Sequence, residues 1–152
     1  MQTLVKLLKK HQYTIASIES LTAGLFSSKL AEVSGASAVL KGALVTYQTI
    51  CKEKVLQVDK NCIDTYGVIS KEVADQMAIK GAEMFQSDIV VSFSGNAGPD
   101  VMDHKAVGLV HMGLWYQGKL FSYEMIFKGT RNEIREQAVA FMCKQIINVI
   151  DF

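Results

Sequence analysis

A serine near the start of the chain is placed for nucleophilic chemistry. Ser20 lies in the run Ile18-Glu19-Ser20-Leu21-Thr22-Ala23-Gly24, which follows an apolar stretch and precedes a segment with helical periodicity. A hydroxyl is a poor nucleophile until a base removes its proton. We predict that Ser20 attacks a carbonyl from a strand-to-helix turn, close to the positive end of the helix dipole. The simpler alternative is a helix N-cap without chemistry.

Two side chains further along the chain are candidates to assist this serine. Lys52 acts as a base only when it is neutral, so its pKa must fall from about 10.4. Burial lowers such a pKa, as do neighbouring cations, for which Lys41 and Lys54 are candidates. Tyr47 closes a predicted strand and is predicted to pass a proton between Ser20 and Lys52. A solvated lysine and a rim aromatic are the alternatives.

Small residues in two places are predicted to line a bound substrate. The first group consists of Thr22, Ala23 and Gly24. Their size leaves room for close approach to backbone N–H groups, which stabilise the oxyanion of an acyl transfer. The second group follows a strand that reads as buried and consists of Gly95, Asn96, Ala97 and Gly98. Its glycines permit positive φ and anion-binding N–H groups, although a tight turn is an equal alternative.

Arg131 is a candidate for binding a phosphate. It lies beside the predicted cap of the last helix. A phosphate at a helix start meets backbone N–H groups as well as a guanidinium. A surface arginine without a ligand is the alternative.

Composition and charge argue against several other functions. The net charge of +1 gives no electrostatic case for nucleic acid or an anionic membrane. No histidine has a partner four residues away, and the three cysteines lack metal-ligand spacing, so no metal site is predicted. The sequence has neither an apolar window of about 18 residues nor a signal pattern, so we expect a cytoplasmic protein.

The elements that position these residues follow from periodicity and capping signals. Helices are predicted over 2–12, 21–33 and 50–58, after Ser70, and after the capping-box spacing of Thr130 to Glu133. Strands are predicted over 13–18, 39–48 and 88–94, with a hairpin over 107–116 and 119–127. This order predicts one domain over residues 1–152. Its predicted fold is a three-layer α/β/α sandwich with a mixed, mainly parallel sheet and a late antiparallel hairpin.

Three polar turns converge in this fold. Ligands of such sheets bind beyond the carboxyl ends of the parallel strands. The segments at those ends are residues 19–24, 47–52 and 94–100. We therefore predict a pocket at this edge that brings Ser20, Tyr47 and Lys52 together.

The same segments resemble, in order, the motifs of a known family. Ile18 to Gly24 is similar to A-E-S-C-T-G-G, and Ser34-Gly35-Ala36-Ser37 with Gly42 to Lys52 resembles S-G-x-S followed by G-x-V-T-Y-S-N-x-x-K. Further matches are Gly67 to Ser70 with G-x-V-S, Ser94 to Pro99 with S-G-x-A-G-P, and Gly129 to Arg135 with G-x-R-x-x-I-R. These motifs resemble the CinA C-terminal domain, the nicotinamide-nucleotide amidohydrolase family also called PncC. The likeness spans residues 14–147.

The resemblance implies a reaction and roles for individual residues. It implies hydrolysis of the carboxamide of nicotinamide mononucleotide to nicotinate mononucleotide and ammonia, with a pyridine nucleotide as the small-molecule partner. Ser20 is implied as the nucleophile, assisted by Lys52 and Tyr47, without a metal or organic cofactor. The chain resembles the stand-alone form that lacks a molybdopterin-binding-like N-terminal domain. A homodimer is expected on general frequency, with Leu4 and Leu8 as candidate contacts.

Several positions depart from the family pattern. Leu21 replaces the usual cysteine, Ala23 replaces a glycine, and Gln48-Thr49 replaces Ser-Asn, while the loop over 101–106 lacks the usual glycine pair. These changes motivate a second hypothesis, a nucleotide- or partner-binding module of the same fold with impaired catalysis. A different amide substrate in the same pocket is a third.

Overall fold

The computed structural model describes residues 1–151, in which helices and strands alternate before a final hairpin and helix. In chain order the elements are α1 (Gln2–His11), β1 (Ile15–Glu19), α2 (Leu25–Ala31), the 3-10 turn η1 (Ala36–Ala38), β2 (Leu40–Val45), α3 (Thr49–Lys54), α4 (Lys60–Tyr66), α5 (Lys71–Phe85), β3 (Ile89–Gly95), β4 (Leu109–Tyr116), β5 (Lys119–Ile126) and α6 (Arg131–Ile150). The element types agree with the periodicities of the sequence, except at the two helices discussed below.

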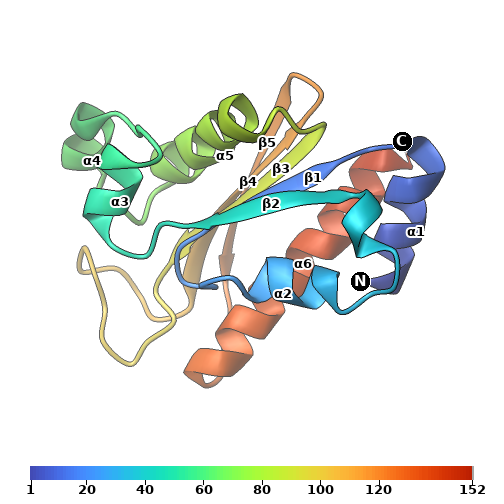
Figure 1. The fold of residues 1–152 in the computed structure, drawn as a ribbon. Coiled ribbons are helices and arrows are strands. Elements are labelled where there is room, and N and C mark those ends of the chain that lie inside the picture. The colour runs from blue at the N-terminus through green and yellow to red at the C-terminus, as the bar shows by residue number, and fades with distance from the viewer. Residues whose placement is uncertain (152) are drawn as a thin grey trace.

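One sheet of strand order β2-β1-β3-β4-β5 runs through the middle of the molecule (Figure 1). β1 pairs in parallel with β2 and β3, whereas β3 with β4 and β4 with β5 pair antiparallel. β4 alone therefore runs against the other strands. β4 and β5 form the predicted hairpin, in which Tyr116 pairs with Lys119 across the turn.

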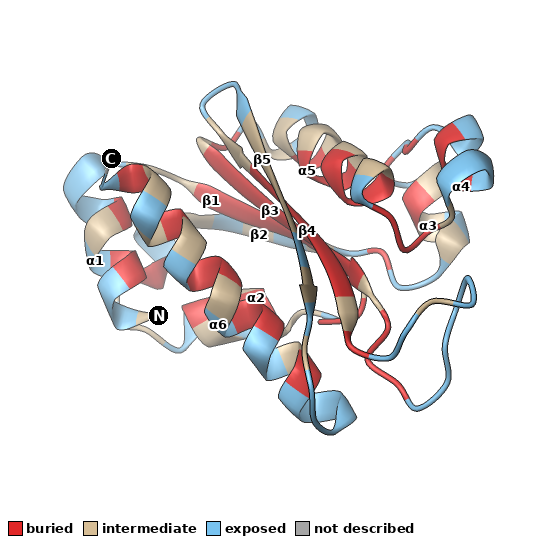
Figure 2. Cartoon of the chain, turned by 180° about the vertical axis from the view of Figure 1, so that it is seen from behind, coloured by how far each residue is buried: buried red, intermediate tan, exposed pale blue. Residues whose placement is uncertain are grey.

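Helices cover both faces of this sheet. α1, α2 and α6 lie on one face, and α5 packs on the other with α4 beside it (Figure 1). Figure 2 shows the buried residues on the central strands and on the helix sides that face them. Residues 89–94 of β3 are buried throughout, as an uninterrupted apolar strand in the middle of a sandwich requires. The predicted three-layer sandwich with a mixed sheet and a late hairpin is confirmed.

Capping groups fix the starts of the two longest helices. Ser70 Oγ accepts a hydrogen bond from the N–H of Val73 at the start of α5. At α6 the Thr130 hydroxyl accepts from the N–H of Glu133, and the Glu133 carboxylate accepts from the N–H of Thr130 at 2.6 Å. Both capping signals were predicted from the sequence and are confirmed.

Two helices differ from the prediction. The helix predicted from residue 21 begins at Leu25, because Ala23 and Gly24 have φ angles of 48° and 91°. A helix requires negative φ, so residues 21–24 form a turn instead. The helix predicted over 50–58 ends at Lys54 and is followed by the unpredicted α4, whose N-cap is the Asp59 carboxylate.

The apolar face of α1 is internal to the chain. Leu4 and Leu8 are fully buried and belong to the core that includes the buried face of α6. They are therefore unavailable as the dimer contacts expected from the sequence. Packing within the chain accounts for their spacing.

Candidate active site

The ends of three parallel strands are tied together around Ser20. Ser20 follows β1, and its N–H donates to the Phe93 carbonyl of β3 at 3.0 Å. Thr46 follows β2, and its N–H donates to the Glu19 carbonyl at 2.9 Å. The backbone that carries the serine is thus held by both neighbouring strands at the predicted edge of the sheet.

The side chains of Ser20 and Lys52 are in direct contact. Lys52 Nζ donates to Ser20 Oγ at 3.0 Å and to the Thr46 carbonyl at 2.7 Å. A distance of about 3 Å allows a neutral amine to take the proton of a hydroxyl. Although 32 residues separate the pair in sequence, α3 returns the lysine to the end of β1.

Burial prepares Lys52 to act as a base. The residue is 2% exposed, and this loss of solvent lowers the pKa of its ammonium from 10.5 to about 8. The cations expected from the sequence do not cause this shift. Lys41 donates to backbone carbonyls at the end of α5, and Lys54 pairs with Glu53. Desolvation alone makes a neutral amine accessible near pH 8.

Glu19 anchors the turn that carries Ser20. Its carboxylate is fully buried and accepts four hydrogen bonds at 2.8–3.1 Å, from the hydroxyl of Ser17 and from the N–H groups of Gly24, Phe26 and Ser27. These N–H groups are ones that the start of a helix leaves unpaired. Glu19 therefore occupies the positive end of α2, close to which Ser20 was predicted to lie.

Residues 20–24, which we call the serine turn, present unpartnered polar groups. Within residues 1–151 the N–H groups of Leu21 and Thr22 donate to no protein acceptor, and Thr22 Oγ1 is buried without a partner. The N–H of Ala23 donates to the Ser20 carbonyl at 3.1 Å, and that of Gly24 is held by the buried carboxylate. Buried polar groups are nearly always paired, so these groups are unusual, as are the unpartnered side-chain atoms of Thr46, Ser87 and His111 elsewhere in residues 1–151.

Ala23 holds a backbone conformation that favours glycine. Its φ of 48° is left-handed, which costs roughly 1–2 kcal/mol for a residue with a Cβ. Replacing Ala23 by glycine relieves this strain but adds about 0.4–1 kcal/mol of unfolded-state entropy. We expect Ala23→Gly to raise the free energy of unfolding by up to about 1 kcal/mol, measured by urea denaturation.

A matched control distinguishes this strain from a general effect of glycine. Ala140 is an exposed residue in the middle of α6, where glycine has no conformational advantage. Ala140→Gly should lower the free energy of unfolding by about 1 kcal/mol. A loss of the same size at position 23 would contradict the role of strain.

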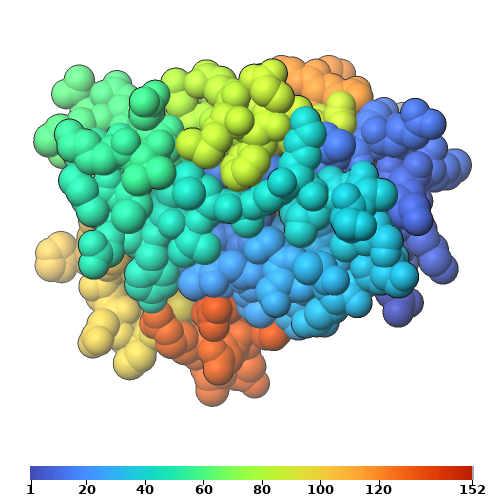
Figure 3. Space-filling view, viewed as in Figure 1, coloured from blue at the N-terminus to red at the C-terminus, as the bar shows by residue number. Residues whose placement is uncertain are grey.

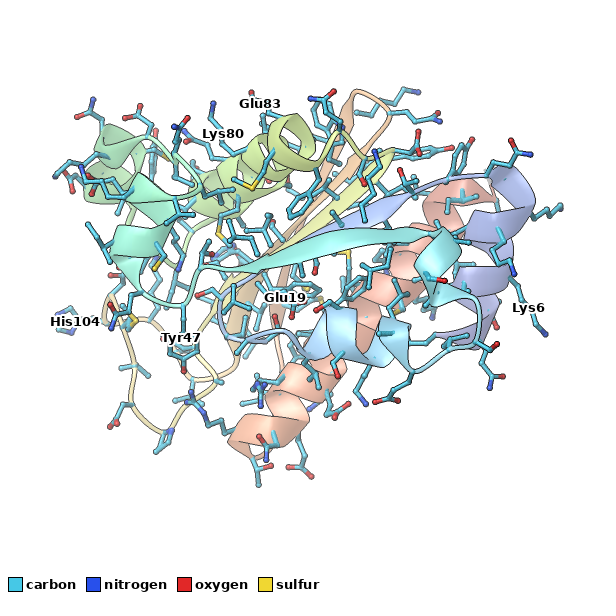
Figure 4. All side chains as sticks on the ribbon, viewed as in Figure 1. Lys6, Glu19, Tyr47, Lys80, Glu83 and His104 are labelled. Atoms are coloured by element: carbon cyan, nitrogen blue, oxygen red, sulfur yellow. The ribbon has the colours of Figure 1, made fainter. Side chains whose placement is uncertain are left out.

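Arg131 joins three segments at the rim of the site. Its Nη2 donates to Tyr47 Oη at 2.6 Å and its Nη1 to the Gly98 carbonyl at 2.5 Å. Figure 3 shows the segment after β2, the loop after β3 and the start of α6 adjoining on the surface. Figure 4 shows Tyr47 below the end of β2, pointing toward that loop. The structure thus brings together the predicted residues of two distant segments with Arg131.

Tyr47 stands apart from the serine and the lysine. The residue is 51% exposed, and within residues 1–151 it has no hydrogen bond to Ser20 or Lys52. Lys52 reaches the hydroxyl directly. The predicted relay of a proton through Tyr47 therefore has no hydrogen-bonded path in this structure.

Asn96 braces the loop after β3. The residue is buried, and its Nδ2 donates to the carbonyls of Met102 and Lys105, both at 3.1 Å. Its Oδ1 accepts from the N–H of Met102 at 2.9 Å. The amide that was expected to face a substrate is therefore occupied within the loop.

The other small residues of this loop allow close packing. A Cβ on Gly95 would lie 2.5 Å from the Leu109 carbonyl of β4, so only glycine fits there. Ala97 is buried in the core. Gly98 has φ of 77°, and its carbonyl is the one that accepts from Arg131. Of the four predicted residues, Gly98 is the one linked by a hydrogen bond to another predicted site residue.

Three further residues build the site without a prediction from the sequence. The Thr46 carbonyl holds Lys52, Glu19 anchors the serine turn, and Arg135 donates to two carbonyls of that turn. The sequence did indicate a special role for Glu19, because a carboxylate at the end of an apolar run is unusual. Arg135 was indicated as well, since it lies four residues after Arg131 and so on the same side of a helix. A backbone carbonyl gives no signal in a sequence.

Outside this site, the described residues 1–151 include a surface cavity that none of the predicted site residues lines. This cavity of about 610 Å³ lies beside α1 and the end of α2, and its walls include Lys6, Lys9 and Lys29. Among the described residues no group of three or more His, Cys, Asp or Glu side chains is placed to hold a metal ion. Nor does this part of the chain contain a helix long and apolar enough to cross a membrane.

The fold and the site together define a class of protein. It is a three-layer α/β domain with a serine and a buried lysine paired at the carboxyl edge of its parallel strands. The particular family follows from comparison with known proteins. The chain belongs to the CinA C-terminal domain family, whose family model matches residues 1–150.

Relatives and solved structures agree with this assignment. A competence-damage inducible protein of Bacillus pumilus is 37% identical over 145 residues, which cover 95% of this chain and 35% of that protein. A CinA-like protein of Petrotoga mobilis is 38% identical over 149 residues, covering 97% and 37% respectively. The chain thus spans about a third of the length of these relatives. A CinA superfamily structure from Klebsiella pneumoniae has the same fold, with a TM-score of 0.96 at 22% identity over 99% of this chain and 94% of that one.

Proposed function

We propose that this domain is an amidohydrolase that cleaves the carboxamide of nicotinamide mononucleotide to nicotinate mononucleotide and ammonia. The observation that supports it most is the 3.0 Å contact between Ser20 Oγ and Lys52 Nζ. That contact lies beside the unpartnered N–H groups of Leu21 and Thr22. Nucleophile, base and oxyanion donors are the groups that acyl transfer requires. The motif resemblance supplies the choice of substrate.

In the first half-reaction Ser20 becomes acylated. Lys52 takes the hydroxyl proton while Ser20 Oγ attacks the carboxamide carbon, and the carbonyl π electrons move onto its oxygen. The N–H groups of Leu21 and Thr22 donate to this oxyanion. Lys52 then returns the proton to the amide nitrogen, the C–N bond breaks, and ammonia leaves an ester on Ser20.

In the second half-reaction water releases the acid. Lys52, neutral again, takes a proton from a water molecule that attacks the ester carbon. The same N–H groups hold the second oxyanion. The C–O bond to Ser20 breaks and the serine oxygen regains a proton from Lys52. The acid product then loses its remaining proton to solvent and leaves as the carboxylate of nicotinate mononucleotide.

The rim residues are proposed to bind the nucleotide. Arg131 is exposed and uses two of its five N–H donors on Tyr47 and Gly98, which leaves donors for the phosphate. The half-exposed ring of Tyr47 offers an apolar surface next to that guanidinium. In this proposal Tyr47 assists by placing the substrate and Arg131 rather than by relaying a proton.

Ammonia release from nicotinamide mononucleotide tests the proposal. Purified protein is incubated with the nucleotide, and ammonia is measured with a coupled dehydrogenase while the acid is identified by chromatography. Ser28→Ala, on the exposed side of α2, is the matched control because it removes a serine hydroxyl outside the site. We expect release by the wild type and by this control but only background by Ser20→Ala.

The same assay distinguishes the competing hypotheses. No release by folded wild-type protein between about pH 7 and 9.5 would count against the amidase, since Lys52 becomes neutral in this range. Calorimetric binding of the nucleotide without turnover, unchanged in Ser20→Ala, would support the binding module. Ammonia from other amides but not from this nucleotide would indicate a different substrate.

A further inference from the structure

Arg135, on the second turn of α6, holds the backbone of the serine turn. Its Nε donates to the Leu21 carbonyl at 2.9 Å and its Nη2 to the Thr22 carbonyl at 2.8 Å. Its Nη1 donates to Asn132 Oδ1 at 3.2 Å. The planar guanidinium thus donates to the carbonyls of two consecutive residues at once. The ammonium of a lysine has no such fork of fixed donors.

The hydrogen bond from Arg135 to the Leu21 carbonyl also fixes the direction of the unpartnered Thr22 N–H. The Leu21 carbonyl and the Thr22 N–H belong to one peptide unit, and in a trans peptide they point in opposite directions. Because the carbonyl points at Arg135, the Thr22 N–H points away from α6. Figures 1 and 2 show α3, which carries Lys52, beyond the end of β2 and beside α4, away from α6. The free N–H and the helix that carries the base thus both lie on the side away from α6.

Two other carbonyls of the turn also accept backbone hydrogen bonds. The Ser20 carbonyl accepts from the N–H of Ala23 at 3.1 Å, and the Thr22 carbonyl accepts from the N–H of Leu25 at 3.0 Å in addition to the guanidinium. Only the Leu21 carbonyl depends on Arg135 alone. Loss of the arginine therefore frees the peptide unit that carries the Thr22 N–H.

Charge strengthens the same donor. Within residues 1–151 Arg135 forms no ion pair with a carboxylate. Its positive charge acts directly on the peptide groups that it grips. Hydrogen bonds in a chain polarise one another, so a cation on a carbonyl makes the N–H of that peptide a stronger donor. The effect is largest where negative charge develops on a bound oxygen.

We propose that Arg135 is a positioning residue for the amidase reaction, acting through the peptide between Leu21 and Thr22. It aims and polarises the Thr22 N–H toward the oxyanion without touching the substrate. The hydroxyl of the same residue, Thr22 Oγ1, is also buried without a hydrogen-bond partner. This inference rests on the proposed function, because the oxyanion arises only in acyl transfer.

Kinetics of Arg135→Met give the first test. We expect kcat to fall about 10–100-fold, less than the 10²–10³-fold reported for losing a whole oxyanion donor, because the N–H remains present. KM should change by less than about threefold, since the ground-state amide needs the donor less. Lys144→Met, an exposed change on the same helix, should leave both constants unchanged. A rise in KM with unchanged kcat would overturn the proposal.

Chemical rescue separates positioning from general support of the fold. Methylguanidinium at tens of millimolar should restore part of the kcat of Arg135→Ala, because it can occupy the vacated place between the two carbonyls. Arg135→Lys should keep more activity than Arg135→Ala, since an ammonium reaches one carbonyl. If both variants melt like the wild type yet show neither rescue nor this order, the role assigned to Arg135 is wrong.

A measurement without substrate keeps this test separate from that of the proposed function. In an amide-resolved NMR spectrum, Arg135→Met should shift the Leu21, Thr22 and Ala23 resonances, while Lys144→Met leaves them in place. An inactive wild type with these shifts would count against the amidase but support the positioning of the turn. An active wild type whose Arg135→Met variant shows neither the shifts nor the loss of kcat would overturn the positioning role alone.

Discussion

Lys52→Met is expected to lower kcat/KM for amide hydrolysis by about 10²–10⁴-fold, the usual contribution of a positioned base. Methionine keeps an apolar chain of similar length in a place that is 2% exposed, but it cannot take the proton of Ser20. The remaining rate would come from binding and from the oxyanion donors. Initial rates of ammonia release over a range of substrate concentrations measure the loss. Lys54→Met, an exposed change on the same helix, serves as the control.

The pH dependence of the wild type should report the same lysine. Burial lowers the pKa of Lys52 to about 8, and only the neutral amine acts as the base. We therefore expect kcat/KM to rise about tenfold per pH unit below 8 and to level off above it. Only about a tenth of the lysine is neutral at pH 7. Activity that falls as the pH rises from 7 to 9 would contradict this assignment.

Lys52→Met should also make the folded chain more stable near neutral pH. Below pH 8 the ammonium is protonated in both states, and the shift of its pKa from 10.5 to about 8 corresponds to a cost of roughly 3 kcal/mol to the folded state. Methionine removes this cost but leaves the Thr46 carbonyl unpaired, which costs about 1–3 kcal/mol. We expect a net gain of about 1 kcal/mol at pH 7 in urea denaturation.

The stability difference between Lys52→Met and the wild type should decrease as the pH rises. As the pH rises from 8 to 10.5, the folded chain loses its proton first, so the wild type becomes more stable. The advantage of methionine should therefore shrink over this interval and vanish or reverse at its upper end. Lys54→Met should stay within about 0.5 kcal/mol of the wild type throughout. A Lys52→Met variant that is less stable at pH 7 than at pH 10, relative to wild type, would be inconsistent with a desolvated ammonium.

Glu19→Gln is expected to lower the free energy of unfolding by about 3 kcal/mol. Each carboxylate oxygen of Glu19 accepts two hydrogen bonds, and of the four donors only the Ser17 hydroxyl can turn to accept, so either orientation of a glutamine amide leaves at least one backbone N–H facing an NH₂ group. Each hydrogen bond to a charged acceptor contributes about 1.5–3 kcal/mol. The serine turn also loses its anchor, so kcat should fall together with stability.

Chemical denaturation of a matched variant isolates this effect. Glu32 lies at the opposite end of α2 and is exposed, so Glu32→Gln should change stability by less than about 0.5 kcal/mol. Equal stability of Glu19→Gln and the wild type would show that the buried carboxylate contributes no more than a neutral amide.

The general architecture could be predicted because it depends on periodic patterns. The apolar run of β3 and the capping residues Ser70 and Thr130 predict elements that the structure confirms. The approach of Ser20 to Lys52 also follows from topology, since both lie just beyond the ends of adjacent parallel strands. The order and direction of the strands, rather than the local sequence, make that contact predictable.

The remaining features depend on contacts that no local pattern encodes. The late start of α2 requires a non-glycine residue, Ala23, at positive φ, which sequence rules disfavour. The approach of Arg131 to Tyr47 joins residues 84 positions apart. The lowered pKa of Lys52 arises from burial, which only the packed chain determines. The start of α2, the contact between Arg131 and Tyr47 and the extent of Lys52 burial could therefore be found only from the folded structure.

The position of α6 as the last helix has a consequence for biosynthesis. The first three strands, the serine and its lysine all lie within residues 1–95, so they leave the ribosome before α6. Arg131 and Arg135 arrive only with the final helix. Ser20 and Lys52 are therefore synthesised before both guanidinium groups, and a chain that stops before residue 131 contains the two residues but lacks the arginines that hydrogen-bond the serine turn and Tyr47.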